Sequence, residues 1–382
     1  MNQIFIYITT FIIQFIIAIE MNMIGSIAPF LSDYFHIKAN MVVLFNLGFS
    51  AVGILVPYLG ILADRFGKKK ILNIALLFFI GGSLLASFSK TPILFAFSRI
   101  FIGLGYYTLS GTNLSYISEF INYENRGKAS GILRTAFGIA TVFTPLYATS
   151  LISRFNNLSS VYLPFVALGI IAFILLLKLP ETEINENSKL DIEGFIRLLK
   201  DSKNKKIFVS IFFISSAPTL TLSFLGIFLA EKFQLTQVQI GYAYTIAAIG
   251  TISGILLASL LADRVGKLKI ARIFFIFMIF AQIPLPYFNG PILVSIFVAI
   301  FALGLDGGWT AYQTFATEVS PQNRGTFMNL FYTTNALTVT FYSFVGSFIY
   351  SLGGYYLAVG IGLISSALGV FLVSTLKEKP VN

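Results

Sequence analysis

The sequence has no cysteine and a single histidine, His36. Without cysteine the chain can form no disulfide framework, thiol nucleophile or cysteine-ligated metal site, and one histidine cannot build a zinc-binding cluster. Charge is scarce too. Asp, Glu, Lys and Arg make up 11% of the 382 residues, whereas a soluble globular domain carries about 25%. So few charges cannot solvate the surface of a soluble protein of this size, and the sequence excludes that class.

What the sequence has instead is long apolar runs, such as IFIYITTFIIQFIIAI near its start. A helix needs about 20 apolar residues to cross a hydrocarbon core roughly 30 Å thick. The first run lacks a preceding basic region and a small-residue cleavage site, so we expect a retained span rather than a signal peptide. The apolar runs predict an all-α membrane protein with twelve transmembrane helices in two pseudo-symmetric six-helix bundles. The expected spans are 4–30, 41–63, 70–89, 92–118, 127–150, 160–179, 207–230, 240–262, 269–288, 291–317, 325–349 and 355–376.

One long polar break divides these spans into an N-terminal bundle, 1–179, and a C-terminal bundle, 207–382. The break, 180–206, is predicted to be a cytoplasmic linker. Within it, LDIEGFIRLLK places most of its apolar side chains on one side of a helix, which is typical of a short helix on the membrane surface. The alternative is a plain solvated linker. The apolar residues in question are Leu190, Phe195, Ile196, Leu198 and Leu199.

The distribution of basic residues predicts the orientation. Most of the 26 Lys and Arg residues fall in loops on the side that contains both termini, and cytoplasmic loops carry the excess of basic residues in membrane proteins. We therefore expect both termini in the cytoplasm and a location in the cell (inner or plasma) membrane. The formal net charge of +10 then reflects topology, so no nucleic-acid partner is expected.

An internal repeat relates the two halves. The segment GILADRFGKKKIL (60–72) is matched by SLLADRVGKLKIA (259–271), and other residues recur in the same order. Because each half contains six spans, both copies enter the membrane in the same direction, as parallel repeats do. The further matches are Pro92 with Pro291, Gly105 with Gly304, Glu119 with Glu318, and Asn125-Arg126-Gly127 with Asn323-Arg324-Gly325.

The duplicated G/S-x-L-A-D-R-x-G-K loop resembles the signature loop of the major facilitator superfamily. Arg99-x-x-x-Gly103-x-Gly105 is similar to that family's second motif, and Glu20 with Pro29 is similar to an acidic motif of some proton-coupled exporters. The resemblance implies a transporter whose two halves rock about a central cavity, with the loops as a cytoplasmic latch that favours the outward-open state. The stretch around Pro145 lacks the glycines of the exporter motif, so the direction of transport stays open.

The physical chemistry of the loop is consistent with a latch. Gly67 permits a tight turn with positive φ, and Asp64 at a helix end can face positive helix N-termini. Arg65 and Arg126 are candidate partners for Asp64 and Glu119. The alternative is that these charges are topology signals and helix stops. The predicted latch residues are Gly60, Asp64, Arg65, Gly67, Lys68, Glu119 and Arg126, with Asp263, Arg264, Gly266, Lys267, Glu318 and Arg324 in the second half.

Ionisable residues inside the membrane are costly and are therefore candidates for function. From the rise per residue, Glu20 and Arg99 lie at similar depth, so we predict a proton-coupling pair; a static ion pair is the alternative. Arg134 lies close enough to the cytoplasm to snorkel there. Asp306 shares a helical face with Trp309 and Gln313, which suits a cationic or hydroxylated ligand, unless hydroxyl groups of a neighbouring span hold its carboxylate. The predicted substrate-binding residues are Asp306, Trp309, Gln313, Asn329, Thr333 and Asn113.

The favoured function is secondary active transport of a small solute by alternating access, as proton-coupled efflux of an amphipathic or cationic compound. Proton-coupled uptake of a sugar or an anionic metabolite is the alternative, and a non-transporting membrane receptor is a remote one. The sequence contains no phosphate-binding G-x-x-x-x-G-K-[S/T] loop, so an ion or solute gradient would supply the energy. We expect no enzyme activity, no cofactor and no metal; the expected partners are the substrate, protons and the lipid bilayer, and we expect a monomer.

Overall fold

The computed structural model describes residues 3–121, 126–185, 192–320 and 324–377, which form helices and turns with no strand among them. Eleven helical stretches in this part are long and apolar enough to cross a membrane. The last of them belongs to α15 (Arg324–Thr375), which has non-helical backbone angles at Gly353 and Gly354. Its 52 residues would extend roughly 78 Å as one straight helix, so α15 is two crossings joined by a turn. The predicted twelve transmembrane helices are therefore confirmed.

The N-terminal half contains six crossings, and the second of these is built from four short helical pieces. The elements are α1 (Gln3–Met23), α2 (Ala28–Phe35), η1 (Ala39–Leu44), α3 (Phe45–Ala51), η2 (Val52–Leu55), α4 (Val56–Phe66), α5 (Lys68–Ser87), α6 (Pro92–Glu119), α7 (Arg126–Phe155) and α8 (Ser159–Leu177). Helix α9 (Ile192–Lys200) follows in the linker.

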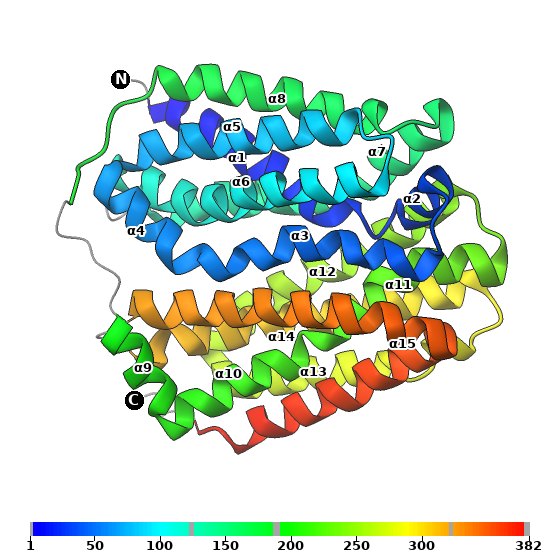
Figure 1. The fold of residues 1–382 in the computed structure, drawn as a ribbon. Coiled ribbons are helices and arrows are strands. Elements are labelled where there is room, and N and C mark those ends of the chain that lie inside the picture. Colours follow the sequence, from blue (N-terminus) through cyan, green and yellow to red (C-terminus); the bar gives the residue numbers. More distant parts are fainter. Residues whose placement is uncertain (1–2, 122–125, 186–191, 321–323, 378–382) are drawn as a thin grey trace.

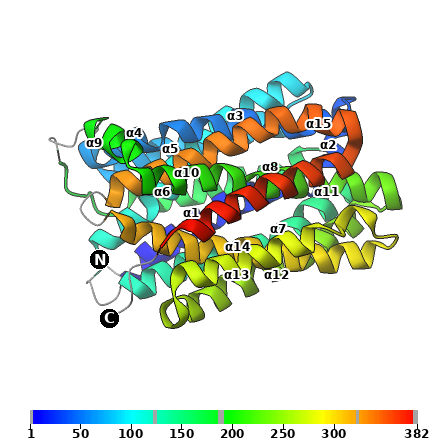
Figure 2. The same cartoon turned by 90° about the horizontal axis from the view of Figure 1, so that it is seen from below.

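The C-terminal half repeats this plan. Its elements are α10 (Ser202–Ile214), α11 (Ser216–Phe233), α12 (Gln237–Val265), α13 (Lys267–Gln282), η4 (Leu285–Tyr287), α14 (Pro291–Val319) and α15. Together α10 and α11 form one crossing. Figures 1 and 2 show the long helices side by side. The start of α1, the end of α15 and α9 lie at one end of the bundle, called here the α9 end, and α2 lies at the opposite α2 end.

The first crossing differs from its predicted range of 4–30. Helix α1 ends at Met23, and the chain turns before α2 begins. The Ser26 hydroxyl donates to the Met23 carbonyl at 2.8 Å, which satisfies an acceptor that a helix end leaves free. Pro29 stands in the first turn of α2, where its missing N–H costs nothing. The break places a glycine, Gly25, in the turn between the two helices.

The duplicated loops are tight turns between consecutive helices. Gly67 has φ +89° and Gly266 has φ +106°, a region that glycine enters without the steric cost of a Cβ. Helix α5 begins directly after the first glycine and α13 directly after the second. The positive φ expected at Gly67 is confirmed, and the repeat places Gly266 in a similar conformation.

The linker contains the predicted short helix, α9. Leu198 is buried among apolar residues of the C-terminal half, while Ile196 and Leu199 are exposed. Leu190 lies outside the described residues. Helix α9 therefore packs on the C-terminal half through one side and leaves part of its apolar side uncovered.

The two halves meet along two helix pairs and at the α2 end. Helix α7 packs on α12, the pieces from η1 to α4 pack on α15, and α2 packs on α11. Near the α2 end the Asn40 amide donates to the Ser347 carbonyl at 3.0 Å. Further toward the middle, the Thr340 hydroxyl donates to the Ser50 hydroxyl at 2.8 Å. The described contacts between halves thus extend from the α2 end to about the middle of the bundle.

Candidate functional site

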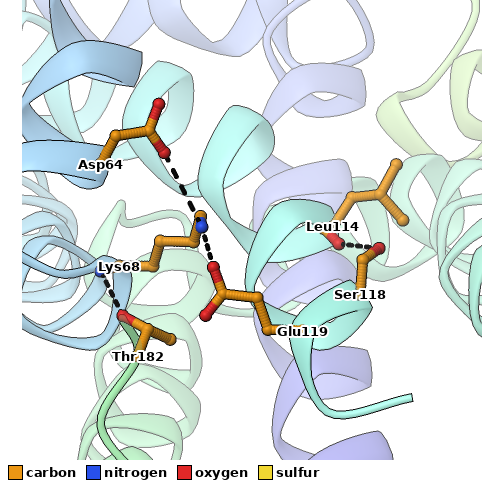
Figure 3. A network of polar contacts seen from close by, with 6 residues as sticks. All are labelled: Asp64, Lys68, Leu114, Ser118, Glu119 and Thr182. Carbon is orange, nitrogen blue, oxygen red and sulfur yellow. Dashed lines mark hydrogen bonds and ion pairs between the residues drawn. The ribbon is translucent and has the colours of Figure 1, made fainter. Parts of the chain in front are cut away.

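Each duplicated loop builds a small charged network at the α9 end. In the N-terminal half, the Lys68 ammonium forms an ion pair with Glu119 and lies 3.7 Å from Asp64 Oδ1 (Figure 3). In the C-terminal half, Lys267 pairs with Glu318 and lies 3.8 Å from Asp263. The lysine connects three consecutive crossings in each case. Each of the two networks lies within its own half of the protein.

Arg65 and Arg264 are not the partners of Asp64 and Asp263 that the sequence suggested. Arg65 and Arg264 are exposed, and neither forms an ion pair among the described residues; the side chains of Arg126 and Arg324 lie outside that part. The reason is the glycine turn: because α5 begins directly after Gly67, Lys68 returns toward Asp64 at i,i+4 spacing. A role of these networks as a latch between the halves stays a prediction.

A short segment after α8 covers the first of these turns. The Thr182 hydroxyl accepts from the Lys68 backbone N–H at 2.8 Å (Figure 3), and Asn185 N–H donates to the Asp64 carbonyl at 2.9 Å. Lys69 pairs with Glu181 at 2.9 Å. These bonds satisfy helix-end groups of α4 and α5. This contribution could not be predicted from the sequence, because nothing in the pattern of residues 179–185 indicates which turn they contact.

A pocket of about 150 Å³ begins beside the first network. Helices α4 and α6 form its walls, and Asn329 of α15 closes it from the other half. It therefore lies between the halves, on the α9 side of their contacts. Its lining mixes polar and apolar side chains: Val56, Leu59, Gly60, Ala63, Asp64, Lys68, Tyr107, Thr108, Gly111, Thr112, Ser115 and Asn329.

The predicted Glu20–Arg99 pair is present. Glu20 Oε1 forms an ion pair with Arg99 Nη1, and both side chains are buried. The guanidinium carbon lies 4.7 Å from the centre of the Phe49 ring. Close packing of α6 on the second crossing supports this position, since a Cβ on Gly103 would lie 2.7 Å from the Phe49 carbonyl. Within the described residues, Glu20 Oε2 and Arg99 Nε have no hydrogen-bond partner.

The predicted substrate-binding residues do not form one cluster. Asp306 Oδ2 accepts from the Thr251 hydroxyl of α12 at 2.7 Å, which is the contact expected for the alternative interpretation. Trp309 packs on Phe331 of α15, with ring centres 5.0 Å apart. The Gln313 amide donates to a tyrosine hydroxyl of α15. Helix α14 therefore directs the carboxylate and the other two side chains toward different neighbours.

The remaining predicted polar residues have separate surroundings. Asn113 is fully buried, and its amide donates to the Thr10 carbonyl at 2.9 Å, which joins α6 to α1. The Thr333 hydroxyl is buried without a hydrogen-bond partner among the described residues. Asn329 alone of the predicted binding residues lines the pocket. Tyr107, Thr108 and Thr112 line it as well, and only their polarity within an apolar span pointed to them.

The charged network supports a stability prediction. Lys68→Gln should lower the free energy of unfolding by about 1 kcal/mol, because two carboxylates would lose a largely buried cation. Arg65→Gln is the matched control, since that arginine is exposed three residues away, and its effect should stay within about 0.5 kcal/mol. Denaturant titration of both variants in mild detergent measures the difference. Equal effects would show that Lys68 does not stabilise the turn.

Taken together, two related six-crossing halves, a buried ion pair at membrane depth and a pocket of mixed polar and apolar lining between the halves define a multi-pass α-helical membrane protein with a two-bundle fold. A comparison with known protein families supports this assignment. The model of the Major Facilitator Superfamily matches residues 10–301 and 207–382. The chain belongs to this superfamily.

Relatives and solved structures are consistent with this membership. The chain is 23% identical to the uncharacterized MFS-type transporter YceJ of Bacillus subtilis, over 99% of this chain and 97% of that protein. It is 25% identical to a triacylglyceride transporter of Mycolicibacterium smegmatis over 48% of this chain. The matches to that protein and two other curated relatives span 30%, 61% and 36% of their lengths. The fold superimposes on the nucleoside transporter NupG with a TM-score of 0.77 at 17% identity, covering 97% and 98% of the two chains.

Proposed function

We propose that this protein is a secondary transporter that moves a small solute by alternating access between its two halves. The observation that carries the proposal is the asymmetry of the contact between the halves. They pack together from the α2 end to the middle, while a pocket lined by polar and apolar side chains lies between them on the α9 side. A rocking motion of two parallel repeats would exchange these arrangements and expose the pocket to the opposite side.

On the positive-inside rule we assign the α9 end to the cytoplasm. Many lysines lie at this end, and they include Lys200, Lys203, Lys205 and Lys206 in α9 and α10. On this assignment the pocket belongs to an inward-facing arrangement, in which the halves have separated on the cytoplasmic side. The confinement of each charged network to its own half fits a latch that has opened.

Proton coupling is assigned to the Glu20–Arg99 pair. The two side chains are buried together, and one oxygen and one nitrogen have no hydrogen-bond partner in the described part of the chain. Unsatisfied buried charge is costly, so a group at this position gains by exchanging a proton or rearranging when the halves move. An anionic substrate is less well supported, because Glu20 already neutralises Arg99.

The substrate class that we favour is an amphipathic or cationic compound, and the direction is export. Asp306 has a single hydroxyl partner, at Thr251, among the described residues, so its charge remains available to a cation. Trp309 lies one turn further along α14 and presents an aromatic surface of the kind that cations bind. The names of the relatives refer to chemically different substrates and do not narrow this choice.

Flux into proteoliposomes tests the proposal, with ethidium as a permanently charged aromatic probe. An acidic lumen should speed ethidium uptake several-fold over protein-free liposomes, because protons would leave as the cation enters. Asp306→Asn should reduce that uptake, while Asp33→Asn, at the far end of α2, should not. Uptake equal to protein-free liposomes at every gradient would count against cation transport. Acceleration only by an acidic exterior would favour uptake coupled to protons.

A further inference from the structure

A tyrosine of α12 reaches into the backbone of α11. The Tyr244 hydroxyl donates to the Leu222 carbonyl at 2.6 Å and accepts from the Gly226 N–H at 3.1 Å. These are the two groups that an α-helix pairs with each other across one turn. A side chain inserted at such a position sets the local course of the helix. The turn from Leu222 to Gly226 is therefore shaped by a neighbouring helix.

The adjacent residue of α11 is held by two more helices. The Thr221 carbonyl accepts from the Tyr355 hydroxyl at 3.2 Å, and its own hydroxyl accepts from the Gln282 amide at 2.8 Å. Tyr355 belongs to α15, and Gln282 is the last residue of α13. Three helices of the C-terminal half thus brace one turn of α11, through a half-buried tyrosine, Tyr244, and through the buried side chains of Tyr355 and Gln282.

The same turn is where the C-terminal half touches the N-terminal half. A Cβ on Gly226 would lie 2.6 Å from the Gly25 carbonyl oxygen and 3.4 Å from Pro29 Cδ. A Cβ on Gly25 would in turn lie 3.1 Å from the Tyr244 hydroxyl. The two glycines let the backbones of the halves approach directly at the α2 end, and Tyr244 stands beside both.

We propose that Tyr244 is a positioning residue for closure at the α2 end: its hydroxyl holds the α11 turn in the shape that lets Gly226 dock on Gly25. The inference rests on the proposed alternating access and adds the residue that stabilises one of its two states. Without the hydroxyl, Leu222 and Gly226 would pair with each other, and the turn would lose the shape that docks. The state closed at the α2 end should then become less populated.

Tyr244→Phe tests this, because it removes one oxygen and keeps the ring. The cysteine-free sequence permits spin labels at two introduced cysteines without background. Lys90→Cys and Asn289→Cys suit the α2 end, since both residues are exposed in turns that the repeat relates. The Tyr244→Phe variant should raise the population with a long label distance about fivefold, the size expected from one net hydrogen bond. A second pair, Lys70→Cys with Lys269→Cys, should shorten at the α9 end.

Two controls separate positioning from general stability. Tyr242→Phe lies on the same helix, where the tyrosine is exposed, and should change nothing. Tyr355→Phe removes a bond to the same turn without touching Gly25; it should lower the melting temperature and leave label distances unchanged. Gly25→Ala, an independent variant, should open the α2 end even if Tyr244→Phe folds poorly.

The outcomes distinguish this inference from the function on which it rests. If the unmodified background populates both distances but Tyr244→Phe leaves their ratio unchanged, Tyr244 has no positioning role and alternating access stands. If Tyr244→Phe lowers the melting temperature while the ratio stays constant, the residue is structural only. A single distance at both ends under every pH and probe condition would contradict alternating access and this inference together.

Discussion

Replacing Arg99 by methionine should lower the free energy of unfolding by about 3–5 kcal/mol, the usual cost of removing one partner of a buried ion pair. Glu20 is fully buried and its ion-pair partner is Arg99, so the variant would leave a carboxylate without compensation. Arg154→Met is the control, because that arginine is exposed at the far end of α7. Denaturant titration in mild detergent would compare the two.

The double variant Glu20→Gln with Arg99→Met distinguishes two quantities. One is the net contribution of the ion pair to the free energy of unfolding, and the other is the destabilisation caused by removing only one partner. A buried pair replaced by neutral side chains of similar size is often nearly neutral in stability, because the desolvation cost of both charges disappears. The double variant should therefore recover most of the stability that Arg99→Met loses. It should also abolish the response of transport to a pH gradient. Additive losses in the double variant would show that the two side chains act independently.

This pair is the part of the site that sequence reasoning predicted best. Depth in the membrane follows from the position of a residue along an apolar run, because the rise per residue is constant. The spacing therefore predicts that Glu20 and Arg99 lie at similar depth in the membrane. Because an unpaired charge is costly at that depth, it also favours pairing of the two side chains. The twelve crossings followed from the same logic of apolar length. Both predictions depend only on the positions of residues along the chain, which can be read directly from the sequence.

Other features depend on how helices rotate against one another, which spacing does not show. Arg65 and Lys68 are both basic and both near Asp64, and the turn at Gly67 decides that Lys68 returns to the carboxylate. Asp306 shares a side of its helix with polar and aromatic residues, yet the register of α12 brings Thr251 to it. For the end of α1 at Met23, the local sequence offers one indication of a helix break, the nearby Gly25.

The largest conformational effects are expected from two glycines of the second crossing. A Cβ on Gly53 would collide with Ala336 of the other half and lie 2.8 Å from the Tyr107 ring. Gly60, further along the same crossing, has nothing within 4 Å and lines the pocket. The first glycine is therefore needed where the halves meet, whereas the second faces the space between them.

Gly53→Val should disfavour the state closed at the α2 end, because overpacking costs about 1–3 kcal/mol, or a shift of roughly 5- to 150-fold in the equilibrium. Gly60→Val should do the opposite, because the halves would meet at the α9 end only after a rocking motion that brings this residue into contact. Gly81→Val is the neutral control, since that glycine also has open space around it and lies on α5, away from the pocket lining.

Label distances at residues 90 and 289, and at 70 and 269, would measure these shifts without a known substrate. For Gly53→Val the population with a long label distance at the α2 end should increase, and for Gly60→Val the population with a long label distance at the α9 end should increase. Both variants should slow ethidium flux at least tenfold, because a transporter held in either state cannot complete its cycle. If the protein alternates between two states, Gly53→Val should favour opening at the α2 end and Gly60→Val should favour opening at the α9 end, and both variants should lose flux. Loss of flux with identical distances would instead indicate that the glycines serve the pocket rather than the motion.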